Sequence, residues 1–156
     1  MGIDLTEYFF VGLVASFDPA HGTAVVTRPD RDGRTTAPLS VLQRGAKDTK
    51  DFWMPAIDDQ VLCVLLPDSS GKGPSMGWIV GASYSGVDGV PAGAGGTTRV
   101  LDHPGDLTMR IGGTLKIEAG TLDIKGGGDV VASGISLTSH VHGGVMSGGS
   151  TTSGPQ

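Results

Sequence analysis

The sequence predicts an all-β protein built in two parts, a small barrel followed by a stack of short strands. Three observations lead to this prediction. All eight aromatic residues lie before residue 85, whereas 18 of the 27 glycines lie after it. Apolar and polar residues alternate along most segments, which is the periodicity of strands with one buried face. Turn residues such as glycine, proline and aspartate separate these segments.

Residues 1–85 carry the sequence features of a barrel. Their apolar, β-branched segments are short, and the turns at 18–22 and 30–33 contain Asp with Gly. Five such strands in a segment of this length predict a small closed barrel of the OB type. We expect the aromatic residues of this half to belong to its core. The predicted strands are 9–17, 23–27, 34–39, 60–66 and 76–84.

The glycine-rich stretch 86–97 predicts a linker. Beyond it, the apolar residues follow a different spacing. Pairs of aliphatic residues recur there, mostly every seven or eight residues, with glycines or polar turns between the pairs. This punctuation predicts stacked strand–turn units over 98–139. The aliphatic residues are Leu107, Met109, Ile111, Leu115, Ile117, Leu122, Ile124, Val130, Ala132, Ile135 and Leu137.

One chain cannot bury this second half by itself. Each strand–turn unit offers only two or three inward side chains, and the sequence provides no second sheet to cover them. Three identical copies wound about a common axis would place each apolar face against the others. They would also close a triangular prism without a free strand edge, which avoids edge-to-edge aggregation. The sequence therefore predicts a homotrimer that is intertwined over this half.

The charge and composition of the chain exclude several classes of binding partner. The net charge is -5 and the pI is about 5.1, which argues against bulk nucleic acid or an anionic membrane surface as a ligand. The only cysteine, Cys63, lies in an apolar segment, so we expect a buried and inert thiol. The first residues lack a basic n-region and no apolar run is long enough for a bilayer span. We expect a protein that is made soluble in a bacterial cytoplasm.

The strongest chemical motif is the histidine pair His140 and His142. Side chains at positions i and i+2 of a strand point the same way, so both imidazoles lie on one face. On a three-fold axis, two histidines per chain become six nitrogen ligands. Six ligands suit an octahedral first-row transition metal better than zinc, which prefers four. Ligand chemistry alone does not distinguish iron from nickel or cobalt.

The segment 139–144, followed by the Gly-, Ser- and Thr-rich segment 148–155, resembles the C-terminal apex of phage baseplate assembly protein V, the central spike of P2-like and Mu-like contractile tails. Residues 55–65 and 77–84 are similar to the OB-domain signature of that family. Asp58 and Asp59 stand where the family often has Gly-Glu, and Ser153 near the terminal Gly-Pro is a second mild departure.

The resemblance implies a homotrimer with an OB collar at 1–85, a linker at 86–97, a triple-stranded β-helix shaft at 98–139 and a metal-binding apex at 140–156. It implies one iron ion per trimer, held by His140 and His142 of each chain. It also implies that the protein is not an enzyme but a membrane-piercing spike in the virion baseplate. The OB domain would contact the tail hub and tail tube, and the tip would meet the host outer membrane. No nucleic-acid partner is expected.

Two other functions stay open at this point. A trimeric β-helical metalloenzyme of the γ-carbonic anhydrase type also uses histidines near a three-fold axis, but it needs hexapeptide repeats and an open zinc position, and the sequence has neither. A non-piercing adaptor at the tail tip would share the barrel without explaining the histidine pair. His21 and His103 both lie in turns, and we expect them to be ordinary surface residues.

Overall fold

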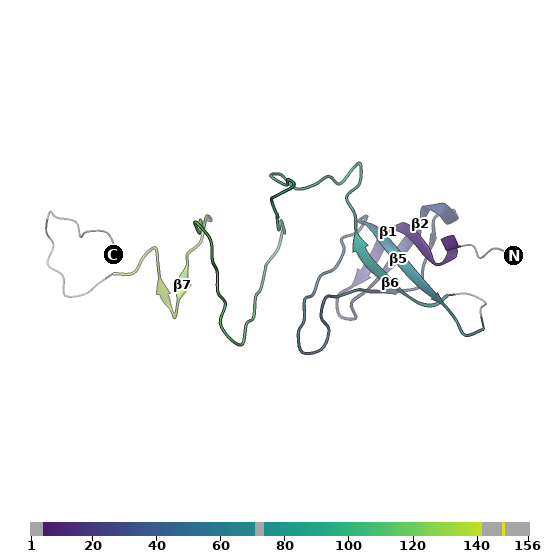
Figure 1. Ribbon diagram of the computed structural model, residues 1–156, viewed down its shortest axis with the longest axis horizontal. Helices are drawn as coiled ribbons and strands as arrows, with labels where there is room; N and C mark the ends of the chain where they lie inside the picture. The colour runs from purple at the N-terminus through teal and green to yellow at the C-terminus, as the bar shows by residue number, and fades with distance from the viewer. Residues whose placement is uncertain (1–4, 71–73, 142–147, 149–156) are drawn as a thin grey trace. The chain divides into compact units, whose positions relative to one another are not determined.

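The computed structural model describes residues 5–70, 74–141 and 148, and it divides the chain into two compact units, 1–106 and 107–156 (Figure 1). Within the described residues the regular structure consists of strands and two short 3-10 helices, with no α-helix. The all-β prediction is therefore confirmed. No described helix has the length and apolar character needed to cross a bilayer.

The first unit contains six strands and both 3-10 helices. The strands alternate buried and exposed side chains, most clearly in β2, where every second residue is buried. The elements are η1 (Leu5–Glu7), β1 (Phe9–Asp18), β2 (Thr23–Arg28), η2 (Pro29–Arg31), β3 (Arg34–Thr35), β4 (Leu39–Val41), β5 (Gln60–Pro67) and β6 (Pro74–Ala82).

Five of these strands close into a barrel. The strand order is β1-β5-β6-β4-β2-β3, and an additional β1–β2 pairing closes the ring. β1 achieves this by pairing with β5 over its first half and with β2 over its second half, with a bulge between Val14 and Ser16. β4 and β6 pair in parallel and the other pairs are antiparallel. The prediction of a five-stranded barrel is confirmed.

The barrel interior is a compact apolar core. Gly12 lies where β1 crosses β2, and a Cβ at this position would stand 2.5 Å from the carbonyl oxygen of Thr27. Only glycine allows this close approach of the two strands. The buried apolar residues of the core are Phe10, Val14, Ala24, Val26, Leu39, Val41, Val61, Cys63, Leu65 and Ile79.

Two details differ from the predictions. The segment predicted as one strand over 34–39 is interrupted, because β3 ends at Thr35 and β4 begins only at Leu39. Pro38, which has no N–H to donate, precedes β4. The aromatic residues are also not all in the core. Phe10 is buried and Tyr8 and Trp53 pack against the core, whereas four others are exposed: Phe9, Phe17, Phe52 and Tyr84.

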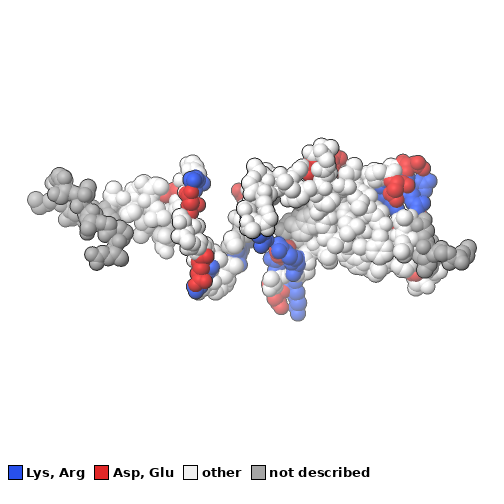
Figure 2. Space-filling view, turned by 45° about the horizontal axis from the view of Figure 1, so that its top comes forward, with Lys and Arg blue, Asp and Glu red and all other residues white. Residues whose placement is uncertain are grey.

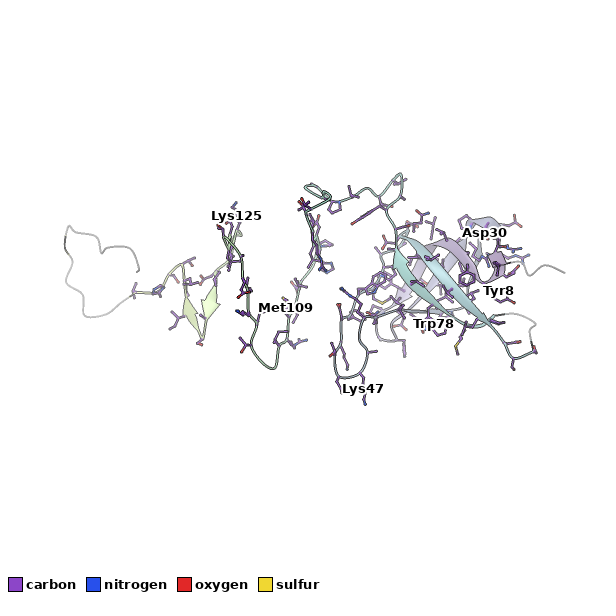
Figure 3. The ribbon with its side chains drawn as sticks, viewed as in Figure 1. Tyr8, Asp30, Lys47, Trp78, Met109 and Lys125 are labelled. Atoms are coloured by element: carbon purple, nitrogen blue, oxygen red, sulfur yellow. The ribbon has the colours of Figure 1, made fainter. Side chains whose placement is uncertain are left out.

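In the second unit, regular structure is confined to one hairpin among the described residues, formed by β7 (Val131–Ala132) and β8 (Ile135–Ser136). Side chains around Met109 and Lys125 project from extended chain (Figure 3). The division of the second half into linker, shaft and apex stays a prediction, as does the triple-stranded β-helix.

Candidate metal-binding apex

The β7–β8 hairpin leads into the predicted apex. Its two turn residues, Ser133 and Gly134, both have positive φ, at 51° and 82°. This pair of left-handed residues is the requirement of a two-residue type I′ hairpin turn, whose twist matches that of the strands. The Leu137 N–H donates to the carbonyl of Val130 at 2.9 Å and extends the pairing beyond β8. The turn therefore fixes the start of the segment that leads to His140.

Asp129 ties this segment to the base of the hairpin. Its carboxylate accepts hydrogen bonds from the hydroxyl of Thr138 at 2.8 Å and from the N–H of Thr138 at 3.2 Å. Hydrogen bonding by the side chains of Ser136 and Thr138 lowers the pKa of Asp129 below its ordinary value. The carboxylate is therefore ionised at neutral pH and holds the chain two residues before His140.

Ser136 organises the residues that follow. Its hydroxyl accepts hydrogen bonds from the N–H of Ser139 at 2.8 Å and from the Ser139 hydroxyl at 2.7 Å. Its carbonyl lies 3.3 Å from the backbone nitrogen of His140, which donates to it. These bonds form one turn after β8, and this turn places the His140 side chain.

The same Ser136 carbonyl determines the tautomer of His140. Nδ1 of His140 lies 2.7 Å from this oxygen. A carbonyl oxygen can only accept, so Nδ1 must carry the proton in this hydrogen bond. In the neutral imidazole the lone pair then belongs to Nε2, which is how metal-binding histidines are commonly oriented by a backbone carbonyl. The ring of His140 therefore has the protonation pattern of a ligand that binds a metal through Nε2.

The second predicted ligand, His142, lies outside the described residues. Among the residues that the structure does describe, no group of three or more His, Cys, Asp or Glu side chains is placed to hold a metal ion. His140 is exposed in the single chain. One described histidine fits a transition metal by its donor chemistry, and completing a site would require further imidazoles from the same and other chains.

The apolar residues before the apex are exposed in the single chain. Their exposed fractions lie between 52% and 64%. Charged residues alternate with them, and Lys116 pairs with Glu118 while Lys125 pairs with Asp123 at 2.6 Å. The segment thus has one apolar and one charged set of positions. The exposed apolar residues are Leu107, Met109, Ile111, Leu115, Ile117, Leu122, Ile124, Val131, Ile135 and Leu137.

The barrel carries a second exposed apolar surface, which the sequence prediction missed. It is the outer face of β1, β5 and β6, where residue pairs such as Val11 with Leu62 and Leu66 with Met76 lie side by side. Contiguous exposed apolar surface of this kind marks interaction sites. The available signal was that both alternating sets of β5 are apolar. The surface consists of Phe9, Val11, Leu13, Leu62, Val64, Leu66, Met76, Trp78 and Val80.

Other reactive side chains of the described chain have ordinary environments. Cys63 is fully buried, and burial raises the pKa of its thiol to about 12, so it is unreactive at neutral pH. His21 is an exposed turn residue whose Nδ1 lies 2.7 Å from the Asp18 carboxylate. His103 is exposed in irregular chain. None of the three belongs to the β7–β8 hairpin.

Comparison with known proteins agrees with this location. Residues 134–156 match the family model described as the GpV Apex motif. The match starts at the Gly134 turn and includes both His140 and His142. No curated protein matches the chain. Over this apex segment the chain is therefore similar to the phage baseplate protein V, or central spike, family.

Proposed function

We propose that this chain is the membrane-piercing central spike of a contractile phage tail or a tail-like particle, and that it works as a homotrimer. The observation that carries the proposal is the coincidence of the apex motif with His140 at the end of a long row of exposed apolar side chains. The function is mechanical. Sheath contraction drives the tube forward, and the spike is the first part to meet the host outer membrane.

The exposed apolar row supports the trimer. Burying an aliphatic side chain contributes roughly 1.5–3 kcal/mol, and a single chain leaves more than half of each of these side chains in water. Two further copies around an axis would cover the row while the alternating Lys and Glu or Asp side chains stay outside. The outer apolar face of β1, β5 and β6 gives the barrel a surface that can contribute to the same assembly.

In this proposal His140 and His142 of three chains hold one iron ion at the tip. The ion supplies a cross-link between chains at the point where terminal residues would otherwise fray. The hydrogen bond from Nδ1 of His140 to the Ser136 carbonyl orients Nε2 as the ligand atom. With six imidazoles the coordination shell is full, so the proposal assigns no catalytic role to the metal.

Molar mass and elemental analysis of the same purified sample test the proposal. We expect three times the 15.8 kDa chain mass and one metal ion per three chains. In the double variant His140→Ala with His142→Ala, we expect the same mass and no bound metal. The matched control is His21→Ala with His103→Ala, which removes two exposed histidines elsewhere and should keep the metal.

The outcomes separate the alternatives. A metalloenzyme of the γ-carbonic anhydrase type would hold one ion at each subunit interface, so three ions per trimer would favour it. A tail-tip adaptor without an apex site would form a trimer without metal. Unchanged metal content in the His140 and His142 double variant would refute the ligand assignment, and a well-folded monomer would refute the spike.

A further inference from the structure

The barrel wall has an opening between β3 and the first half of β6. β3 lies at the edge of the sheet and pairs only with β2. β4 reaches β6 only at Trp78 and Ile79, so the preceding residues of β6 have a strand neighbour on the β5 side alone. The chain between β3 and β4, which contains Pro38, belongs to no strand. Two strand edges therefore border one opening.

A cavity of about 380 Å³ occupies this opening. Its apolar wall comes from Leu39, Leu65 and Met76, which belong to three different strands. Its other wall is basic. Arg28, Arg31 and Arg34 all line the cavity, and Glu7 is the one acidic residue among the described residues that line it. Figure 2 shows acidic and basic side chains gathered side by side at one end of the barrel unit, and Figure 3 labels Asp30 there.

Arg28 is a fixed part of this wall. Only 7% of the residue is exposed, and its guanidinium lies 4.0 Å from the centre of the Phe10 ring. Nη2 donates to the Asp30 carboxylate and to the Thr6 carbonyl, each at 2.7 Å. A buried arginine needs such partners, because an unpaired buried charge is strongly unfavourable. Asp30 therefore compensates the charge of Arg28.

The other two arginines of the cavity differ in their pairing. Arg31 pairs with Glu7 at 2.7 Å, so the second carboxylate is also engaged. Arg34 is exposed, and no described carboxylate forms an ion pair with it. Among the described residues, Arg34 is therefore the cavity arginine open to an external partner. A guanidinium in this position is suited to bind an external carboxylate in bidentate fashion.

We propose that this cavity is a docking site for an extended, acidic peptide segment of another tail protein. A Glu or Asp side chain of the segment pairs with Arg34, and a neighbouring aliphatic side chain lies against Leu39, Leu65 and Met76. The backbone of the segment lies along the open edge beside β3, as in recognition by strand addition. The partner is another protein rather than a second copy, because acidic side chains in the extended second unit, such as Glu118 and Asp123, already pair with lysines of their own chain. That the partner is a tail protein rests on the proposed function, whereas the docking site itself requires neither the trimer nor the metal.

A peptide titration tests the docking site in the full-length protein. The probe is acetyl-Leu-Val-Glu-Val-Leu-amide, and its control has Gln in place of Glu. Backbone amide NMR signals of the 15N-labelled protein report where each peptide binds and how tightly. We expect shifts confined to the cavity residues, such as Thr35, Leu39 and Gly77, and about tenfold tighter binding of the Glu peptide, the factor typical of one charge-assisted hydrogen-bonded pair.

Arg34→Gln should reduce binding of the Glu peptide to the level of the Gln peptide, because it removes only the external charge partner. The matched control is Arg110→Gln, an exposed arginine of the second unit, which should change nothing. Absence of binding, equal affinity for the two peptides, or shifts centred elsewhere would overturn the proposal. A molar mass that falls in Arg34→Gln would also overturn it, because a second copy would then be the occupant.

Discussion

Ile117→Ser tests the proposal that residues 107–137 are stable through burial between chains. Ile117 is 61% exposed in the single chain, so more than half of its apolar surface remains to be buried on assembly. Complete burial of such a side chain contributes roughly 2.5 kcal/mol, which leaves roughly 1.5 kcal/mol to be gained per chain. Three copies at the same level of the axis give roughly 4.5 kcal/mol. The association constant of the trimer should therefore fall about a thousandfold.

The neighbouring Lys116 provides the matched control. Its side chain is 76% exposed and belongs to the charged set of positions, where it pairs with Glu118. Lys116→Ser should change the association constant by less than tenfold, because exposed ion pairs contribute little. Sedimentation equilibrium over a range of concentrations measures both variants. Equal effects of the two substitutions would refute the reasoning, because the apolar positions would then have no special role in assembly.

Two further predictions concern the barrel. Burial raises the pKa of the Cys63 thiol from 9.0 to about 12. Alkylation of the native protein by iodoacetamide near neutral pH should therefore be roughly a thousandfold slower than alkylation of the unfolded chain. Rapid alkylation of the native protein would contradict the buried position of this thiol. The hydrogen bond from Arg28 lowers the pKa of Asp30 below its ordinary value of 3.8. The ion pair therefore stabilises the folded barrel above pH 3.8. Its contribution to the free energy of unfolding is lost as the pH falls through the lower pKa of the folded state. Asp30→Asn should lower the melting temperature at pH 7 and make it depend less on pH below 3.8. If the melting temperature of the variant depends on acidic pH in the same way as that of the unaltered protein, the ion pair does not stabilise the barrel.

The strands of the barrel could be predicted because each has local signals at both ends. Segment 60–66 is apolar and β-branched, and β5 was found at Gln60–Pro67. The interruption near Pro38 was missed because the alternation of apolar residues continues across it. Which side of β5 faces the core could not be predicted, since Val61 and Leu62 are equally apolar and only the closed barrel buries one of them.

Features of the barrel that depend on residues far apart in the sequence could not be predicted. The sequence around Arg28 gives no sign that this charged residue is buried, and contacts with Phe10, Thr6 and Asp30 together make its burial favourable. The cavity depends on β3 and β6 lying on opposite sides of one opening, although about forty residues of sequence separate them. At the apex, the histidine pair could be recognised from its spacing, but the tautomer of His140 depends on the turn at Ser136.

In the proposed assembly, the apolar contacts between chains contribute more to the free energy of association than the metal ion does. Ten apolar side chains per chain are exposed along 107–137, whereas the ion would connect the chains only at one end. Burial is distributed over the whole row, so losing the ion removes a constraint on the last residues and leaves the rest covered. This is why the proposal expects the His140 and His142 double variant to remain a trimer while its terminal segment frays. The proposal thus assigns assembly to the apolar row and the sharpness of the tip to the histidines.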